Sequence, residues 1–106
     1  MIHFRRTIQI APGRQADAVA RGHEWVAIHI KATGVDVRVS VVTTGTLSRI
    51  CFSADFESMG AHEVIGAKAG AHPDWIALEA RSRQEERDGT SMYVPGTWHD
   101  EYWRDA

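Results

Sequence analysis

Hydrophobic and polar residues alternate over residues 2–13 (IHFRRTIQIAPG). The apolar positions of this stretch are Ile2, Phe4, Ile8 and Ile10. A period of two predicts a strand with one buried face, which Pro12 and Gly13 end. Arg6 interrupts the apolar series between Phe4 and Ile8, where burying an unpaired guanidinium would cost several kcal/mol. Arg6 is therefore the first candidate functional residue.

A helical pattern follows over residues 14–33 and is closed by Gly34, which suits a C-terminal cap. Its main stripe of apolar and small residues is Val19, Gly22, Val26 and Ile30. Trp25, Ile28 and Ala32 lie off this stripe and widen the apolar arc. The helix is therefore expected to contact a second helix or a neighbouring subunit as well as the sheet.

Two strands come next. Four valines alternate with polar residues over residues 35–41, and apolar residues alternate again over residues 49–56. The second apolar series is Ile50, Phe52, Ala54 and Phe56. With a turn at residues 43–46, the pattern predicts a β-hairpin with one apolar face.

Two helices are expected after this hairpin. Ser58 suits the N-cap of a helix over residues 59–71 that is rich in Gly and Ala. Interior glycine costs about 1 kcal/mol relative to alanine, so this helix either packs very close to the sheet or leaves room there. His72 and Pro73 interrupt it, and Pro73 suits the first turn of a third helix that ends near Asp88, before Gly89.

The C-terminal segment, residues 90–104, is predicted to form a last strand that is bent at Pro95-Gly96, where proline favours a sheet edge or a bulge. It carries four aromatic residues: Tyr93, Trp98, Tyr102 and Trp103. So many aromatic side chains in a terminal strand suggest that it is held in place, across a subunit boundary.

The order strand, helix, strand, strand, helix pair, strand predicts a single α+β domain over residues 1–106. Its fold class is ferredoxin-like βαββαβ, a four-stranded antiparallel sheet with helices on one face and the first and third strands central. Arg6 falls on the helix side. The opposite face carries charged residues, among them His3, Arg5, Arg38 and Asp55, and would be either solvated or paired with a twin sheet.

Composition excludes several function classes. Hydrophobic residues make up 43% of the chain, charged residues 25%, and the formal charge is −2, which argues against a nucleic-acid partner. No apolar run suits a membrane span and no signal-peptide core begins the sequence, so a cytoplasmic location is expected. The single Cys51 is interpreted as a small, partly buried filler rather than a nucleophile. The histidines lack metal-ligand spacing and no phosphate-binding glycine loop occurs, so no metal and no cofactor are expected.

Three short segments resemble a known family. Residues 4–13 (FRRTIQIAPG) are similar to the opening strand of NIPSNAP-like proteins, members of the dimeric α+β barrel superfamily. Residues 56–63 (FESMGAHE) resemble their strand-to-helix junction, and residues 71–75 (AHPDW) their Asp-Pro-Glu-Trp segment. Ile8 stands where the family has an aromatic residue, and His72 replaces an acidic one.

This resemblance implies a homodimer whose sheets face each other, with a pocket between sheet and helices in each subunit. The superfamily includes cofactor-free monooxygenases of antibiotic biosynthesis and polyketide cyclases. Some of these cyclases carry His-Pro-x-His at the helix break, with the second histidine as a base. Trp75 occupies that place here, which argues against this mechanism.

Arg6 is the predicted anchor for a carboxylate, phenolate or carbonyl oxygen in the pocket. The alternative is a structural role, in which Arg6 pairs with Glu63, Glu79 or another acid, or reaches solvent. Phe4 and Phe52 share its face of the sheet, and Trp75 would line the pocket for a planar ligand or serve in core packing or at the dimer seam.

His62 and His72 flank the small-residue helix and are the candidate acid/base residues. Each could instead be a surface or capping histidine. His99 is a further ligand-binding candidate, which would reach the pocket from the last strand or lie exposed on the edge.

The sequence thus predicts a small homodimeric protein that binds an aromatic or anionic organic molecule beside Arg6. The sequence leaves open whether the protein is an enzyme. If it is one, we expect a cofactor-independent monooxygenase, cyclase or isomerase. The alternative is a non-catalytic interaction or scaffold domain. A cavity of about 300 Å³ or more beside Arg6 would favour ligand binding, and a filled core with an exposed Trp25 would favour protein contact.

Overall fold

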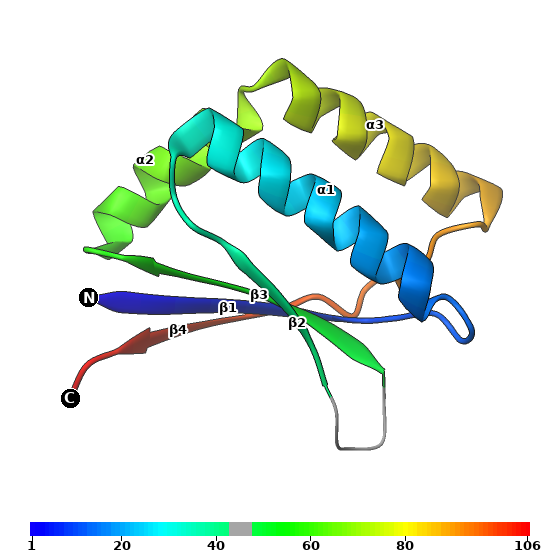
Figure 1. Ribbon diagram of the computed structural model, residues 1–106, viewed down its shortest axis with the longest axis horizontal. Coiled ribbons are helices and arrows are strands. Elements are labelled where there is room, and N and C mark those ends of the chain that lie inside the picture. The colour runs from blue at the N-terminus through cyan, green and yellow to red at the C-terminus, as the bar shows by residue number, and fades with distance from the viewer. Residues whose placement is uncertain (43–47) are drawn as a thin grey trace.

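The computed structural model describes residues 1–42 and 48–106. Within these ranges it contains seven elements, shown in Figure 1: β1 (Ile2–Gln9), α1 (Gln15–Thr33), β2 (Arg38–Val41), β3 (Arg49–Phe56), α2 (Met59–Gly70), α3 (Pro73–Asp88) and β4 (His99–Arg104). This is the predicted order of strands and helices.

The four strands form one antiparallel sheet in the order β2-β3-β1-β4, so β1 and β3 are central as predicted. All three helices lie on the same side of this sheet (Figure 1). The sequence prediction of a ferredoxin-like α+β fold is therefore confirmed.

The strand register decides which side chains share the helix side. Arg6 is opposite Phe52 on β3 and opposite Asp100 on β4. Directly opposed residues of antiparallel strands point to the same face, so all three side chains face the helices. The same face supplies the core, in which Ile8 and Ile50 are fully buried. The predicted apolar face of the sheet is thus confirmed.

Helix α1 packs closely on the sheet at Gly22. A Cβ at this position would lie 2.9 Å from Cδ1 of Ile50, so only glycine fits without a shift. The predicted stripe is wrong at its last member, since Ile30 is 40% exposed near the end of the helix. Trp25 meets Trp75 of α3, with ring centres 4.6 Å apart, which is the expected helix–helix contact.

A partly buried ion pair joins α1 to α3. Arg21 is only 8% exposed, and its Nη1 and Nη2 donate to the two carboxylate oxygens of Glu85 at 2.6 and 2.9 Å. Nη1 also donates to Ser82 Oγ at 3.0 Å. This two-point contact fixes α3 beside α1 at one end of the helical layer.

The predicted helix ends are confirmed. Gly34 and Gly89 adopt left-handed conformations at the C-caps of α1 and α3, and the Ser58 side chain accepts the Ala61 N–H at 3.0 Å. Pro73 begins α3. The interior glycines of α2 leave room rather than pack tightly, because a Cβ at Gly66 would meet nothing within 4 Å.

Two predicted strands are shorter than expected. The second strand contains only Arg38–Val41 of the predicted residues 35–41, because the chain leaves the Gly34 cap before it reaches β3. The predicted turn at residues 43–46 lies outside the described residues. The last strand contains only His99–Arg104, at the sheet edge. Tyr93 makes an isolated β-bridge to Ile10. Two residues separate this bridge from β4: Pro95, which has no N–H to donate, and Gly96, whose φ is 80°.

Within the described ranges, no helix is both long and apolar enough to cross a membrane. The same ranges contain no group of three His, Cys, Asp or Glu side chains suited to hold a metal ion.

Candidate functional site

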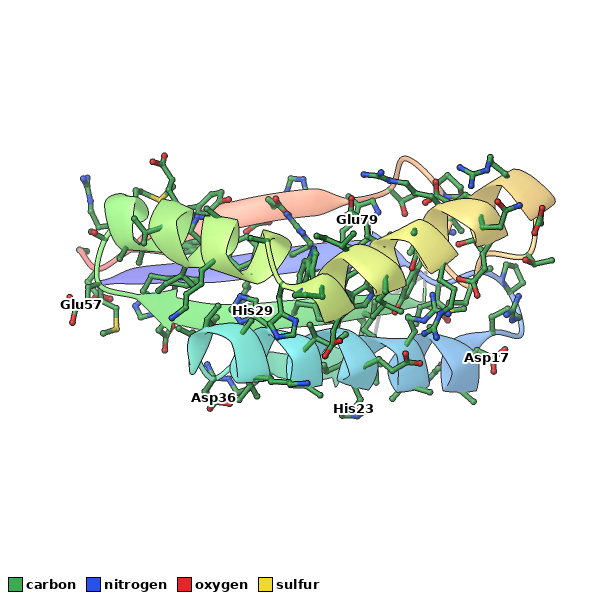
Figure 2. All side chains as sticks on the ribbon, turned by 90° about the horizontal axis from the view of Figure 1, so that it is seen from above. Asp17, His23, His29, Asp36, Glu57 and Glu79 are labelled. Atoms are coloured by element: carbon green, nitrogen blue, oxygen red, sulfur yellow. The ribbon has the colours of Figure 1, made fainter. Side chains whose placement is uncertain are left out.

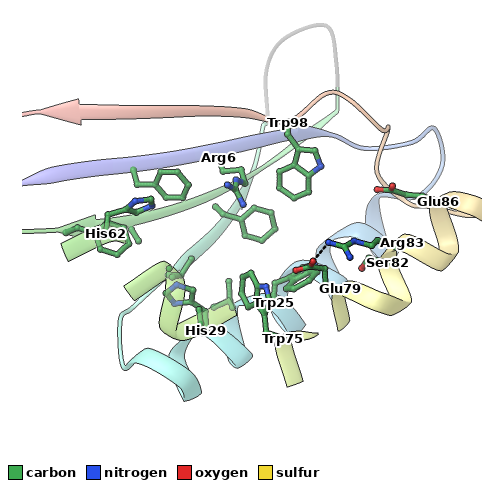
Figure 3. Close-up of a pocket in the computed structure, with 18 residues that line it drawn as sticks. Arg6, Trp25, His29, His62, Trp75, Glu79, Ser82, Arg83, Glu86 and Trp98 are labelled. Carbon is green, nitrogen blue, oxygen red and sulfur yellow. Dashed lines mark hydrogen bonds and ion pairs between the residues drawn. The ribbon is translucent and has the colours of Figure 1, made fainter. Parts of the chain in front are cut away.

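A cavity of about 510 Å³ lies between the sheet and the helices, beside Arg6 (Figure 3). Aromatic side chains form much of its wall: Phe4, Trp25, Phe52, Phe56, Trp75 and Trp98. Small and aliphatic residues complete the apolar part: Val26, Val37, Ala54, Gly66 and Ala69. The room left by the small residues of α2 therefore belongs to this cavity, whose size is typical of small-molecule sites.

The polar lining comes from four elements: Arg6 on β1, His29 on α1, His62 on α2, and Glu79, Ser82, Arg83 and Glu86 on α3. Arg83 is paired with Glu79 one helical turn away (Figure 3). Polar groups thus face an aromatic interior from several directions, as ligand sites require.

Arg6 is both paired and part of the cavity wall. Its Nε and Nη2 donate to the two carboxylate oxygens of Asp100 at 2.7 and 2.8 Å. This hydrogen bond holds the pKa of Asp100 below its usual value and raises that of Arg6. The guanidinium also lies 5.2 Å from the ring centre of Trp98, within cation–π range. Among the described residues, no group accepts a hydrogen bond from the remaining nitrogen, Nη1.

His62 sits at the end of the cavity near the start of α2. Its ring is enclosed by the rings of Phe4, Phe56 and Tyr102, with centres 4.8 to 5.1 Å away. Nδ1 is buried and has no hydrogen-bond partner in the described part of the chain. Burial lowers the pKa of His62, and the positive charge of Arg6 lowers it further. The ring is therefore held neutral.

Phe4, Phe52 and Trp75, the other predicted ligand-binding residues on this side, line the cavity together with Arg6 and His62. His72 and His99 do not. Nδ1 of His72 accepts the Asp74 N–H at 3.1 Å and caps α3, the alternative role considered for it. His99 is exposed on β4, where its Nε2 lies 3.2 Å from Glu101 Oε1.

Sequence reasoning missed His29, and of the polar residues that α3 contributes it names only Glu79, as a possible partner of Arg6. His29 lies four residues after Trp25, so the two share one face of α1, and this spacing could have identified it. Burial lowers the pKa of His29. The sequence does not identify Asp100 as the partner of Arg6 either. It predicts only that Glu63, Glu79 or another acid could pair with Arg6.

No family model and no curated protein matches the chain. Solved structures do match. A NIPSNAP domain protein from Burkholderia xenovorans superimposes with a TM-score of 0.78 at 18% identity, covering 100% of this chain and 95% of its own. A NIPSNAP family protein from Agrobacterium tumefaciens gives 0.77 at 16%, covering 99% and 85%.

A structure from Deinococcus radiodurans, described as a candidate antibiotic biosynthesis monooxygenase, gives a TM-score of 0.65 at 9% identity, covering 100% and 93%. At such identities the likeness concerns the fold, and it agrees with the resemblance of residues 4–13, 56–63 and 71–75. The chain therefore has a ferredoxin-like α+β fold that is similar to the fold of solved NIPSNAP domain proteins.

Proposed function

We propose that this protein binds a small aromatic molecule carrying an oxygen acceptor, in the cavity between sheet and helices. The observation that carries this proposal is the position of Arg6. Its guanidinium lines an aromatic cavity of about 510 Å³ while Asp100 holds it at two points, which leaves Nη1 to donate to a ligand.

The pairing of Arg6 with Asp100 favours a neutral ligand. Asp100 compensates the guanidinium, so the pair offers N–H donors with little net charge, and a carbonyl oxygen suits it better than a full carboxylate. Of the aromatic and anionic ligands that the sequence predicts, the aromatic class is therefore preferred. Trp25 faces the cavity instead of forming an exposed patch, which speaks for ligand binding over the alternative of a scaffold domain.

If the protein catalyses a reaction on this ligand, His62 is the acid/base residue. A neutral imidazole in the cavity can take a proton from a bound molecule, and Arg6 can stabilise the negative charge that develops on the ligand oxygen. No step of this kind requires a cofactor.

We infer that the protein is a homodimer. The sheet face opposite the helices carries no covering element among the described residues (Figure 1), and Trp103 on β4 is 56% exposed. Register places Trp103 opposite His3, on that open face. Native mass spectrometry of the purified protein tests this inference, since a monomer at micromolar concentration contradicts it; the same spectra report any small molecule that copurifies.

The binding proposal is tested with 2-acetylnaphthalene, a neutral planar ketone, by calorimetry and by quenching of tryptophan fluorescence. One molecule per chain is expected, and Arg6→Met should weaken binding at least fivefold, which corresponds to loss of a hydrogen bond worth about 1 kcal/mol.

Gly66→Leu provides a second test of the binding proposal. Gly66 shares one helix face with His62 and the buried Ala69, so a leucine there fills the cavity and should abolish binding. Val64→Leu is the matched control, because Val64 is 70% exposed on the same helix. Unchanged affinity in both Arg6→Met and Gly66→Leu would overturn the proposed function.

A further inference from the structure

His29 is the least expected polar group in the cavity wall. Viewed from above, its side chain lies between α1 and α2, whereas His23 on the same helix points away from the other helices (Figure 2). The His29 ring centre lies 6.1 Å from that of Trp75, at the base of the cavity in Figure 3. His29 therefore faces the cavity from the side opposite Arg6.

Thr33 determines which nitrogen of His29 carries the proton. The Thr33 hydroxyl donates its one proton to the backbone oxygen of His29 at 2.8 Å, and it accepts the Val35 N–H at 3.2 Å. The same oxygen lies 3.2 Å from His29 Nδ1. With the hydroxyl proton on the backbone oxygen, Oγ1 accepts from the ring and Nδ1 is the donor, since a hydroxyl has only one proton to give. The neutral ring then carries its lone pair on Nε2.

Nε2 is left available. In the described part of the chain, Nε2 makes no hydrogen bond. It is not one of the fully buried side-chain atoms without a partner, so it keeps some accessible surface. Burial lowers the pKa of His29, while its interaction with the Val35 backbone offsets this in part. The ring stays neutral at pH 7, which preserves the lone pair.

We propose that Nε2 of His29 is the hydrogen-bond acceptor of the ligand site, where it takes an O–H or N–H group of the bound molecule, and that Thr33 is its positioning residue. This inference rests on the proposed function, since it places a second polar contact in the same cavity. Arg6 donates from the sheet side and His29 accepts from the helix side. The site thus selects molecules with an acceptor at one edge and a donor at another.

Two naphthalene probes test the acceptor directly. 2-Naphthol carries a hydroxyl donor, and 2-methoxynaphthalene keeps the oxygen and the rings but has no donor. The wild-type protein should bind 2-naphthol at least fivefold more tightly by calorimetry. His29→Phe keeps a planar ring and should reduce this preference to about one, while His23→Phe, on the outward side of α1, should leave it unchanged.

The role of Thr33 is tested by the nitrogen-15 chemical shifts of the His29 ring at neutral pH. The wild-type protein and Thr33→Ser should show the proton on Nδ1, and Thr33→Val should lose this bias. A wild-type ring protonated on Nε2 would overturn the inference even if a variant failed to fold.

The outcomes separate the two proposals. Equal affinity of the wild-type protein for both naphthalenes, with 2-acetylnaphthalene still bound, would refute the role of His29 and leave the binding function standing. Failure of all three probes to bind would overturn the binding function and, with it, the inference about His29.

Discussion

Arg6 and Asp100 form a two-point ion pair between neighbouring strands, in register on the helix side of the sheet. The side chain of Arg6 is 41% exposed and that of Asp100 32%, so solvent screens the pair and its contribution to stability is small. Its main consequence is chemical. Asp100 orients the guanidinium and cancels most of its charge toward a ligand.

Replacing Asp100 by asparagine should therefore change ligand preference. The variant keeps an oxygen that can accept from Arg6 but frees the positive charge, so 2-naphthoate should bind about fivefold more tightly than in the wild-type protein, as expected for about 1 kcal/mol between nearby charges. Calorimetry with 2-naphthoate measures this effect.

2-Acetylnaphthalene serves as the neutral control, since its shape is close to that of 2-naphthoate and its affinity should change little. Weaker binding of both probes to Asp100→Asn would contradict this prediction, because it would mean that Asp100 acts only by holding Arg6 in place.

The close approach of α1 to the sheet makes Gly22 sensitive to any side chain. A Cβ there would lie 2.9 Å from Ile50 Cδ1 and 3.4 Å from the Phe52 ring, and Ile50 is fully buried. Gly22→Leu should lower the free energy of unfolding by about 1–3 kcal/mol, the usual cost of overpacking. Chemical denaturation followed by circular dichroism measures the change.

Gly66→Ala is the matched control on a helix that leaves room. No atom lies within 4 Å of its added Cβ, so the better helix propensity of alanine should raise the free energy of unfolding by about 0.5–1 kcal/mol. A stabilising effect of Gly22→Leu, or a destabilising one of Gly66→Ala, would contradict the close packing at Gly22 and the open space at Gly66.

The sequence predicts elements well wherever a local rule governs them. Alternation places β1 and β3, and Gly34, Ser58 and Gly89 mark helix ends, because caps and turns depend on a few neighbouring residues. The tail was harder to predict. Its aromatic residues suggest one continuous strand, but Pro95 and Gly96 end the pairing, and only the residues from His99 onward join the sheet.

The site is predicted only in part. Arg6 stands out because its charge interrupts an apolar series, and its face of the sheet follows from the same alternation. Its partner Asp100 depends on the register between strands that are far apart in the chain, which no local pattern reveals. His29 likewise gains meaning only when α1, α2 and α3 are arranged around a common cavity.

Tyr93 anchors the C-terminal segment to α1. It is 8% exposed, and its hydroxyl donates to the Ala18 backbone oxygen at 2.8 Å. Tyr93→Phe should lower the free energy of unfolding at pH 7 by about 1 kcal/mol, the usual worth of one hydrogen bond. Urea denaturation measures it.

Alkaline pH should reverse this difference. Burial raises the pKa of Tyr93 well above its ordinary value, so the neutral phenol favours the folded state. This stabilisation is complete below the unfolded-state pKa of about 10 and is lost as pH rises from there toward the folded-state pKa. Wild type and Tyr93→Phe should become equally stable about one pH unit above 10, since one unit corresponds to about 1.4 kcal/mol. If the difference in the free energy of unfolding between wild type and Tyr93→Phe stayed constant up to pH 11, this would contradict the burial of the hydroxyl.

His3 links two acidic residues on the open face of the sheet. Its Nδ1 lies 2.7 Å from Asp55 Oδ1 and its Nε2 lies 2.7 Å from Asp105 Oδ1. Only the imidazolium form can donate from both nitrogens, and the hydrogen bond to Asp55, followed by that to Asp105, raises the pKa of His3 above 6.5. Titration by NMR should place the wild-type value above 6.5, and Asp55→Asn should lower it. Asp36→Asn, an exposed change far from His3 in the sequence, is the control and should leave it unchanged. A wild-type pKa at or below 6.5 would mean that this charged network does not form in solution.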